Sequence, residues 1–334
     1  MKKLIIAGDI GGTKTLLRLL EVDSNHSKKL YSQRFASNDY PDFTTLLAAF
    51  IQACQSSVKG QLIAAMCLGI AGPVKERTAK VTNLPWLINA DELQQAFAIA
   101  RVELMNDFMA VGYGLAALQE SELYCLQEAA AIPRATRVVM GAGTGLGQAC
   151  LVWENGQYKP YPSEGSHVDF APRNHIQYEL LKNLQSRFGH VSYERVVSGS
   201  GLVNIFEFLT STQQATAELE HALQSSVDKA ATITAFAVEK KDHLAKQALD
   251  IFIDVYGAQA GNFALTCLAQ GGVYIAGGIA PKLIQRMAQG DFMHAFRDKG
   301  RFASLMESLP VHVVMNAEVG LEGAVQVALR CMPV

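Results

Sequence analysis

The N-terminal segment of the chain carries residue types that could hold a phosphate group and its metal ion. Asp9, a Gly-Gly pair and Thr13 lie between two mainly apolar runs, residues 4–6 and 16–20. Two strand-like runs around a glycine turn predict a β-hairpin. The N–H groups of the turn and the Thr13 hydroxyl could face phosphate oxygens, while Asp9 could face the metal. An ordinary hairpin that contains an aspartate is the alternative.

A second glycine-rich segment repeats this pattern. Residues 141–147 read Gly-Ala-Gly-Thr-Gly-Leu-Gly and lie between the strand-like runs 138–140 and 149–152. The segment is not a Rossmann fingerprint, because the Gly-x-Gly-x-x-Gly spacing fails and a strand follows instead of a helix. Alternating glycines let a backbone pass close to a ligand, although a glycine-rich bulge is an equal alternative. The repeat predicts two related domains, each with a glycine hairpin at a shared cleft.

Two polar residues, Asn106 and Asp107, stand where a strand-like run, 102–105, gives way to a helix-like run, 108–115. In open α/β sheets, ligands collect at this carboxyl edge of the strands. Helix capping favours the same residue types. The pair is therefore either part of a binding site or a helix cap.

Three further residues could contact a polar ligand. Glu164 and His167 are three residues apart in a turn-rich segment, and Glu194 lies shortly before a Ser-Gly-Ser-Gly run. A Glu and a His with small residues between them can point into one pocket. A metal pair would need further ligands nearby. A surface loop, or a solvated charge at Glu194, is the simpler alternative.

A late glycine pair, Gly277 and Gly278, lies between the strand-like run 273–276 and a predicted helix with Pro281 in its first turn. Glycines there let a flat purine or ribose lie against the backbone at a helix N-terminus. A close packing corner between helix and strand is the competing explanation.

The amino-acid composition limits the classes of protein to which the chain can belong. The 334 residues, 49% of them hydrophobic, provide for two domains with large cores. The net charge is −2 and no basic stripe is visible, so we expect no nucleic-acid partner. The six cysteines form no Cys-x-x-Cys and no zinc spacing, which indicates buried thiols of a reducing cytosol. No apolar stretch suits a signal peptide or a membrane span, so we expect a cytoplasmic protein with no membrane partner.

The hydrophobic periodicity predicts the elements that must position these residues. A third strand and a helix begun by Pro41-Asp42 follow the first hairpin, and the C-terminal half is mostly helical. The third strand is expected at 31–35 and further strands at 62–70 and 311–314. Helices are expected at 43–51, 92–98 (capped by Asp91), 176–188, from 202, 217–223, 230–238 (capped by Asp228), 244–269 (capped by Asp242) and 320–329.

Taken in order, these segments resemble the actin-like ATPase, hexokinase and sugar-kinase superfamily, and more closely the bacterial glucokinases of the hexokinase-like kind. The resemblance covers nearly the whole chain. Its matching segments are 8–13, 82–86, 106–108, 141–147, 164–172, 194–199 and 275–279.

The resemblance implies an α/β, two-domain ribonuclease-H-like (actin/hexokinase) fold with an interdomain cleft that closes on the sugar. The small domain would comprise residues 1–117 and 316–334, and the large domain residues 118–315. The family also suggests a homodimer.

The implied activity is the ATP-dependent phosphorylation of D-glucose at its 6-hydroxyl, which gives glucose 6-phosphate and ADP in the first step of glycolysis. Asp107 would be the general base. Mg²⁺ would arrive with ATP, and Asp9 would face it through water. Glucose would be held by Asn106, Asp107, Glu164, His167 and Glu194, and ATP by Gly8, Asp9, Gly11, Gly12, Thr13, Thr144, Gly145, Gly277 and Gly278.

Alternative interpretations of the sequence keep this fold but assign another substrate or another function to the protein. Another hexose or an aminosugar could be the substrate, because carboxylates bind hydroxyls in many sugar kinases. For a sugar-sensing regulator we would expect a helix-turn-helix arm, yet the first strand begins near the start of the chain. A structural relative would have no use for the sugar-binding set. The sister family with a Cys-rich zinc loop is disfavoured, because Ser166 replaces its Gly and the segment directly after His167 contains no Cys.

Overall fold

The computed structural model describes residues 2–23, 26–58 and 60–333 of the chain. Their contacts divide the chain into two compact units. The first unit comprises Met1–Glu120, Glu154–Pro162 and Asn316–Val334, and the second comprises Ser121–Trp153 and Ser163–Met315.

The first unit is built on a five-stranded sheet of order β3-β2-β1-β4-β8. The predicted opening hairpin is confirmed, since β1 pairs antiparallel with β2. Strands β4 and β8 then extend the sheet in parallel. Their bounds are Lys3–Ile10 (β1), Lys14–Val22 (β2), Ser27–Ala36 (β3), Ile63–Ile70 (β4) and Val102–Asn106 (β8).

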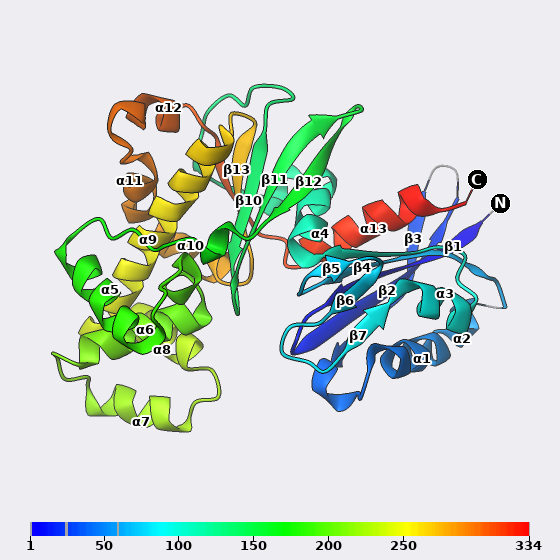
Figure 1. Cartoon of the computed structure of the whole chain (residues 1–334), viewed down its shortest axis with the longest axis horizontal. Helices are drawn as coiled ribbons and strands as arrows, with labels where there is room; N and C mark the ends of the chain where they lie inside the picture. The colour runs from blue at the N-terminus through cyan, green and yellow to red at the C-terminus, as the bar shows by residue number, and fades with distance from the viewer. Residues whose placement is uncertain (1, 24–25, 59, 334) are drawn as a thin grey trace. The chain divides into compact units, whose positions relative to one another are not determined.

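Helices cover both faces of this sheet, because β1 alternates its side chains between two cores. Leu4 and Ile6 pack with helix α1 (Phe43–Ala53), whereas Ile5 and Ala7 pack with helix α13 (Val319–Cys331). Figure 1 shows α1 and α13 on opposite sides of the sheet. The remaining elements of this unit are α2 (Gln55–Val58), β5 (Val74–Lys75), β6 (Thr78–Lys80), β7 (Leu87–Asn89), α3 (Ala90–Phe97), α4 (Asp107–Gly114) and the 3-10 turns η1 (Ser37–Asp39) and η2 (Leu115–Ala117). The 3-10 turn η3 (Glu120–Glu122) includes the boundary between the two units.

The second large sheet of the chain has six strands in the order β12-β11-β10-β13-β14-β9. Strands β10 and β11 form an antiparallel hairpin, and β10, β13 and β14 run parallel. The bounds are Leu123–Gln127 (β9), Arg137–Ala142 (β10), Leu146–Glu154 (β11), Gln157–Ser163 (β12), Gly272–Ala276 (β13) and Val311–Val314 (β14).

The two sheets share one strand plan. The sequence β11-β10-β13-β14 repeats the order and the directions of β2-β1-β4-β8. The glycine-rich segments found in the sequence occupy the same place in both plans, as the turn of the first hairpin. The repeat in the sequence is therefore a repeat of sheet topology.

A long helix, α9 (His243–Cys267), is the centre of the second core. Its Tyr256 hydroxyl accepts a hydrogen bond of 3.1 Å from the backbone N–H of Ala142, at the end of β10. Figure 1 shows α9 beside β10 and β13. The other helices are α5 (His175–Phe188), α6 (Gly199–Thr210), α7 (Ala217–Ser225), α8 (Lys229–Val238), α10 (Ile284–Met287), α11 (Asp291–Arg297) and α12 (Ala303–Glu307), with the 3-10 turns η4 (Gly165–His167), η5 (Tyr193–Arg195), η6 (Ala280–Leu283) and η7 (Gly300–Phe302).

Most predicted strands and helices are confirmed, but three details were wrong. Asn89 caps α3 instead of Asp91, because its side chain accepts from the Asp91 and Glu92 N–H groups. Helix α6 begins at Gly199, three residues early, since Ser198 caps it there. The segment after Gly278 forms a 3-10 turn before α10, not one helix.

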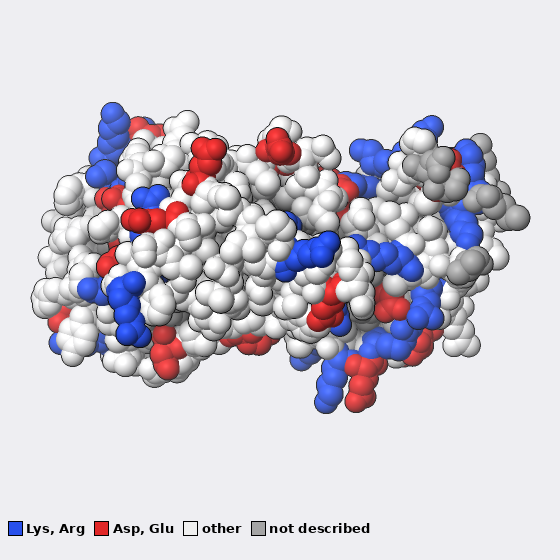
Figure 2. All heavy atoms as spheres, turned by 90° about the horizontal axis from the view of Figure 1, so that it is seen from above, with Lys and Arg blue, Asp and Glu red and all other residues white. Residues whose placement is uncertain are grey.

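The surface shows no single-signed area on the face drawn in Figure 2, where basic and acidic side chains lie close to one another. Within the described residues, no helix is both long enough and apolar enough to span a membrane.

Candidate functional site

The carboxyl edge of the first sheet brings Asp9 and Asp107 into one neighbourhood. Asp9 lies opposite Gly69 of β4, and Gly69 lies opposite Met105 of β8. Asp107 follows β8 and is the first residue of α4. Both aspartates therefore lie where parallel strands end, the edge at which α/β sheets bind ligands.

Gly69 makes this arrangement possible, and no motif in the sequence pointed to this residue. A Cβ atom added to Gly69 would lie 2.9 Å from Ala110 Cβ and 3.9 Å from Asp107 Cα. Any larger residue would push α4 away from β4. The missing side chain thus sets the position of Asp107.

Both carboxyl groups are shifted toward their protonated forms. Burial, and then the negative charge of Asp9, raises the pKa of Asp107 to about 6. Burial likewise raises the pKa of Asp9 to about 6, where Arg34 opposes the shift and Glu318 adds to it. The pair is mostly ionised at pH 7 and titrates close to neutrality, which suits a group that must accept a proton.

Asn106 is a helix cap, as one of the two sequence readings predicted. Its side-chain oxygen accepts from the N–H groups of Phe108, at 2.9 Å, and Met109, at 3.4 Å. Its amide nitrogen lies 3.5 Å from the Gly72 carbonyl. Capping fixes the start of α4 and so the place of Asp107. The cap leaves little freedom to the Asn106 side chain.

The turn of the first hairpin is held from both sides. Ser37 in η1 donates from its hydroxyl to the Gly11 carbonyl, at 2.9 Å, and from its N–H to the Thr13 carbonyl, at 3.0 Å. A Cβ atom added to Gly12 would lie only 2.8 Å from the Thr82 carbonyl oxygen. Thr13 itself is exposed. The turn is rigid, and it presents the Thr13 side chain to solvent.

The turn of the second hairpin contacts Glu194. The Glu194 carboxylate accepts a hydrogen bond of 2.8 Å from the Leu146 N–H. A Cβ atom added to Gly145 would lie 2.5 Å from the same carboxylate oxygen. Thr144, at the tip of the turn, is exposed. Glu194 is therefore oriented by the glycine turn and is not the freely solvated charge of the alternative reading.

Glu164 and His167 lie together on the turn η4. The His167 Nε2 atom is 3.9 Å from a carboxylate oxygen of Glu164, and both side chains are largely exposed. Between them Ser166 is buried. The Glu164 and His167 side chains therefore point outward from this turn. Nowhere in the described part of the chain do three or more His, Cys, Asp or Glu residues form a group that could hold a metal.

The predicted site residues are divided between the two units. The first unit holds Gly8, Asp9, Gly11, Gly12, Thr13, Asn106 and Asp107, and the second holds Thr144, Gly145, Glu164, His167, Glu194, Gly277 and Gly278.

Comparison with known proteins identifies relatives over nearly the full chain. A family model described as Glucokinase matches residues 6–331. The chain belongs to the glucokinase family. The glucokinase of Nostoc sp. strain PCC 7120 is 43% identical over 342 residues, which cover 98% of this chain and 99% of that protein. The glucokinase of Synechocystis sp. strain PCC 6803 is 42% identical, with 96% of each chain covered.

A solved structure with this fold is the glucokinase of an Antarctic psychrotroph. It superposes with a TM-score of 0.82 at 30% identity, and the match covers 98% of this chain and 99% of that one. The mixed α/β fold of this family member is therefore shared with a crystal structure of the family.

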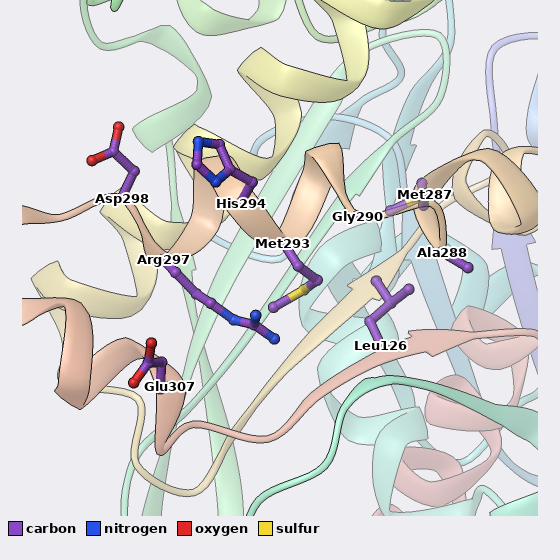
Figure 3. Close-up of a pocket in the computed structure, with 9 residues that line it drawn as sticks. All are labelled: Leu126, Met287, Ala288, Gly290, Met293, His294, Arg297, Asp298 and Glu307. Carbon is purple, nitrogen blue, oxygen red and sulfur yellow. The ribbon is translucent and has the colours of Figure 1, made fainter.

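A hollow in the second unit lies apart from these residues. Its volume is about 530 Å³, and no predicted site residue lines it. Figure 3 shows the Arg297 guanidinium pointing toward its middle, near Met293 and Leu126. The Nε atom of Arg297 donates to the Gln127 side chain. The hollow has no part in the site described above.

The two late glycines, Gly277 and Gly278, have different surroundings. Gly277 has a φ of +82°, and a Cβ atom there would lie 2.5 Å from the Ala142 carbonyl oxygen, so Gly277 is needed for packing. A Cβ atom at Gly278 would meet nothing within 4 Å. Both glycines lie next to the turn of the second hairpin, because Ile279 N–H donates to the Ala142 carbonyl, at 3.2 Å.

We expect Gly278→Ala to raise the KM for ATP at least about tenfold, a loss of ~1.4 kcal/mol of binding, because its methyl group would occupy the open space to which the sequence prediction assigns adenosine. The thermal midpoint of unfolding should not change. Gly277→Ala is the comparison variant, and its midpoint should fall, since its φ and its contact with β10 both exclude a side chain. Steady-state kinetics that gave Gly278→Ala a normal KM for ATP would contradict this adenosine position.

Proposed function

We propose that this member of the glucokinase family transfers the γ-phosphoryl group of ATP to the 6-hydroxyl of D-glucose, with Asp107 as the general base. The observation that carries the proposal is the Asp9–Asp107 pair at the carboxyl edge of the sheet, with the pKa of Asp107 near 6. A base with this pKa is ionised at neutral pH and is still able to take a proton.

Each set of site residues would have its own task. Asp107 accepts the proton of the 6-hydroxyl, and the Asn106 cap holds Asp107 at the start of α4. Hydrogen bonds from sugar hydroxyls to carboxylates and amides give selectivity, because an unmatched polar group in a dry site is costly. Glucose would contact Asn106, Asp107, Glu164, His167 and Glu194.

ATP would lie along the two glycine hairpins. The residues assigned to it are Gly8, Asp9, Gly11, Gly12, Thr13, Thr144, Gly145, Gly277 and Gly278. The exposed Thr13 and Thr144 hydroxyls, each at the tip of a rigid turn, suit phosphate oxygens. The open space beside Gly278 suits the adenosine.

Magnesium would enter as part of the MgATP substrate. Two mutually repelling, desolvated carboxylates, Asp9 and Asp107, fit a nearby cation, because positive charge would relieve their repulsion. Bound magnesium neutralises charge on the phosphates during transfer. Asp9 would orient the hydrated ion through water, and it would not itself exchange a proton with the sugar.

The finer description of the fold belongs to the same proposal. The shared strand plan of the two sheets supports a two-domain ribonuclease-H-like (actin/hexokinase) fold. We infer domains of residues 1–117 with 316–334 and of residues 118–315, with a cleft between them that closes on the sugar. A cytoplasmic homodimer is part of this proposal.

We expect the rate to have an acid limb near pH 6. Protonated Asp107 cannot accept the hydroxyl proton, so kcat/KM for glucose should fall as the pH drops through about 6. Asp9→Asn removes the neighbouring charge and should move this limb to lower pH, whatever its effect on the maximal rate. A pH–rate profile from 5 to 9 tests both, and a limb that stays in place in Asp9→Asn would contradict the coupling.

The substrate is tested with a panel of sugars and ATP in an assay coupled to ADP release. We expect glucose to give the highest kcat/KM among glucose, mannose, fructose, galactose and glucosamine. Preference for another member of the panel would show a kinase for that hexose or aminosugar. Sugar binding without any turnover would instead favour the non-catalytic sugar sensor.

A further inference from the structure

Two polar side chains of α9, Gln259 and Asn262, lie behind the turns that carry the proposed sugar ligands. The Asn262 amide nitrogen donates to the Tyr193 hydroxyl, at 3.0 Å, and to the Gln259 side-chain oxygen, at 3.3 Å. The Gln259 amide nitrogen in turn lies 3.5 Å from the Gly165 carbonyl oxygen. One chain of hydrogen bonds thus runs from η5 through α9 to η4.

Tyr193 is the point at which this chain meets both turns. It is 3% exposed, and its hydroxyl also hydrogen-bonds the backbone of Ala171. Its ring packs edge-on against Phe170, with 5.8 Å between centroids. Its N–H donates to the Val168 carbonyl, at 3.2 Å. Tyr193 therefore fastens the segment that follows His167 to the turn that carries Glu194.

Tyr193 and Gln259 are buried and Asn262 is half-buried, whereas the side chains they support face outward. Gln259 is 4% exposed and Ser166 2% exposed. The Glu164 and His167 side chains on the same turn are 84% and 57% exposed. A buried amide that loses its partner carries the full cost of desolvation. The network therefore favours one arrangement of the two turns over others.

Two other contacts join these turns directly but do not involve α9. The His190 ring nitrogen lies 2.9 Å from the His167 carbonyl oxygen, and Phe170 N–H donates to the Val191 carbonyl, at 2.9 Å. These contacts bring the turns together. The amides of α9 add hydrogen bonds from both turns to the helix at the centre of the second core.

We propose that Asn262 and Gln259 are positioning residues that fix the spacing of the Glu164–His167 turn and the Glu194 turn for binding of the sugar. They act through Tyr193 and Gly165 and touch no substrate. This inference rests on the proposed function, because the sugar ligands are part of that proposal. Neither amide stood out in the sequence, where α9 is a largely apolar helical pattern.

The first variants break the Asn262–Tyr193 hydrogen bond from either end. Asn262→Leu also loses the bond to Gln259, and Tyr193→Phe also loses the bond to the Ala171 backbone. Asn262→Leu deletes the amide, and Tyr193→Phe deletes only the hydroxyl while keeping the buried ring. A hydrogen bond of ordinary strength corresponds to about fivefold in binding. We expect each variant to raise the KM for glucose about three- to tenfold and to change the KM for ATP by less than about twofold. The double variant should raise the KM for glucose by less than the product of the two single effects, because both single variants remove the bond between Asn262 and Tyr193.

The matched control is Gln127→Met, which breaks another buried amide network in the same unit. The Gln127 amide donates to the Met306 and Leu309 carbonyls, at 2.8 and 2.6 Å, and neither carbonyl belongs to the Glu164–His167 turn or to the Glu194 turn. We expect this variant to lower the thermal midpoint without changing the KM for glucose. Equal effects of Gln127→Met and Asn262→Leu on that KM would overturn the proposal.

A second measurement separates this inference from the proposed function. In hydrogen exchange, Asn262→Leu should speed the exchange of amides in residues 164–171 and in residues 193–197 together, and Gln127→Met should not. If the wild-type protein failed to phosphorylate glucose, the proposed function would be wrong. The hydrogen-exchange rates of the two turns would still show whether Asn262 positions them. Unchanged exchange at both turns in Asn262→Leu would reject the positioning role, whatever the activity.

Discussion

Asp107→Asn is expected to lower kcat for glucose phosphorylation by about 10²–10⁴-fold, the contribution typical of a general base. The amide keeps the size of the carboxylate and its place at the start of α4, but it cannot take the hydroxyl proton. The remaining hydrogen bonds to glucose are retained, so the KM for glucose should change far less than kcat. Steady-state kinetics with purified protein measure both.

The stability of this variant gives an independent check with a defined sign. The folded protein binds the Asp107 proton more tightly than the unfolded chain, because burial raises the pKa from 3.8 to about 6. Between pH 4 and 6 this carboxyl therefore reduces the free energy of unfolding as the pH rises. Asp107→Asn should be more stable than the wild type at pH 7, and the gain should disappear near pH 4. Urea unfolding at both pH values measures it.

A matched control separates the chemistry of Asp107 from its location at a helix end. Asp42 caps α1, where its carboxylate accepts from the Thr45 N–H, at 2.7 Å. Asn is also a good cap, so Asp42→Asn should keep both activity and stability. A near-normal turnover in Asp107→Asn would show that another group is the base.

Gly323→Ala is expected to reduce the free energy of unfolding by about 3 kcal/mol, although alanine is the better helix former by ~1 kcal/mol. A Cβ atom at Gly323 in α13 would lie 1.7 Å from the Ala110 carbonyl oxygen of α4. Gly114 in α4 is equally constrained, since a Cβ atom there would lie 1.9 Å from the Val319 carbonyl oxygen. The two helices contact each other through backbone, and backbone has no rotamer with which to move aside.

Gly320→Ala is the control on the same helix. A Cβ atom at Gly320 would have its nearest neighbours 3.7 to 3.9 Å away, an ordinary contact. This variant should be as stable as the wild type or slightly more stable, through its helix propensity. Urea midpoints of both variants provide the comparison, and a neutral Gly323→Ala would contradict the close α4–α13 contact. Displacement of α4 should also disturb Asp107 at its first residue.

The local elements were predictable wherever one strong local signal decided them. The Gly-Gly turn of residues 11–12 set the first hairpin, and a continuous apolar run set β4. Asp42, Asp228 and Asp242 cap their helices as predicted. Asp91 was a wrong choice, because Asn89 was an equally good cap two residues earlier, and the end of β7 placed the helix start there.

The sequence alone determined the two glycine hairpins, the strand-to-helix step at Asn106 and the family to which the chain belongs, because each depends on neighbouring residues and on their order. The tertiary structure alone decided which residues support them. Gly69 lets α4, which begins at Asp107, pack close to β4. The Leu146 N–H orients Glu194, and Asn262 hydrogen-bonds Tyr193, which is 69 positions away in the chain. The pKa of Asp107 also depends on Asp9, a neighbour in space that is distant in sequence. Such contacts follow from packing between elements, and no periodicity or local motif encodes them.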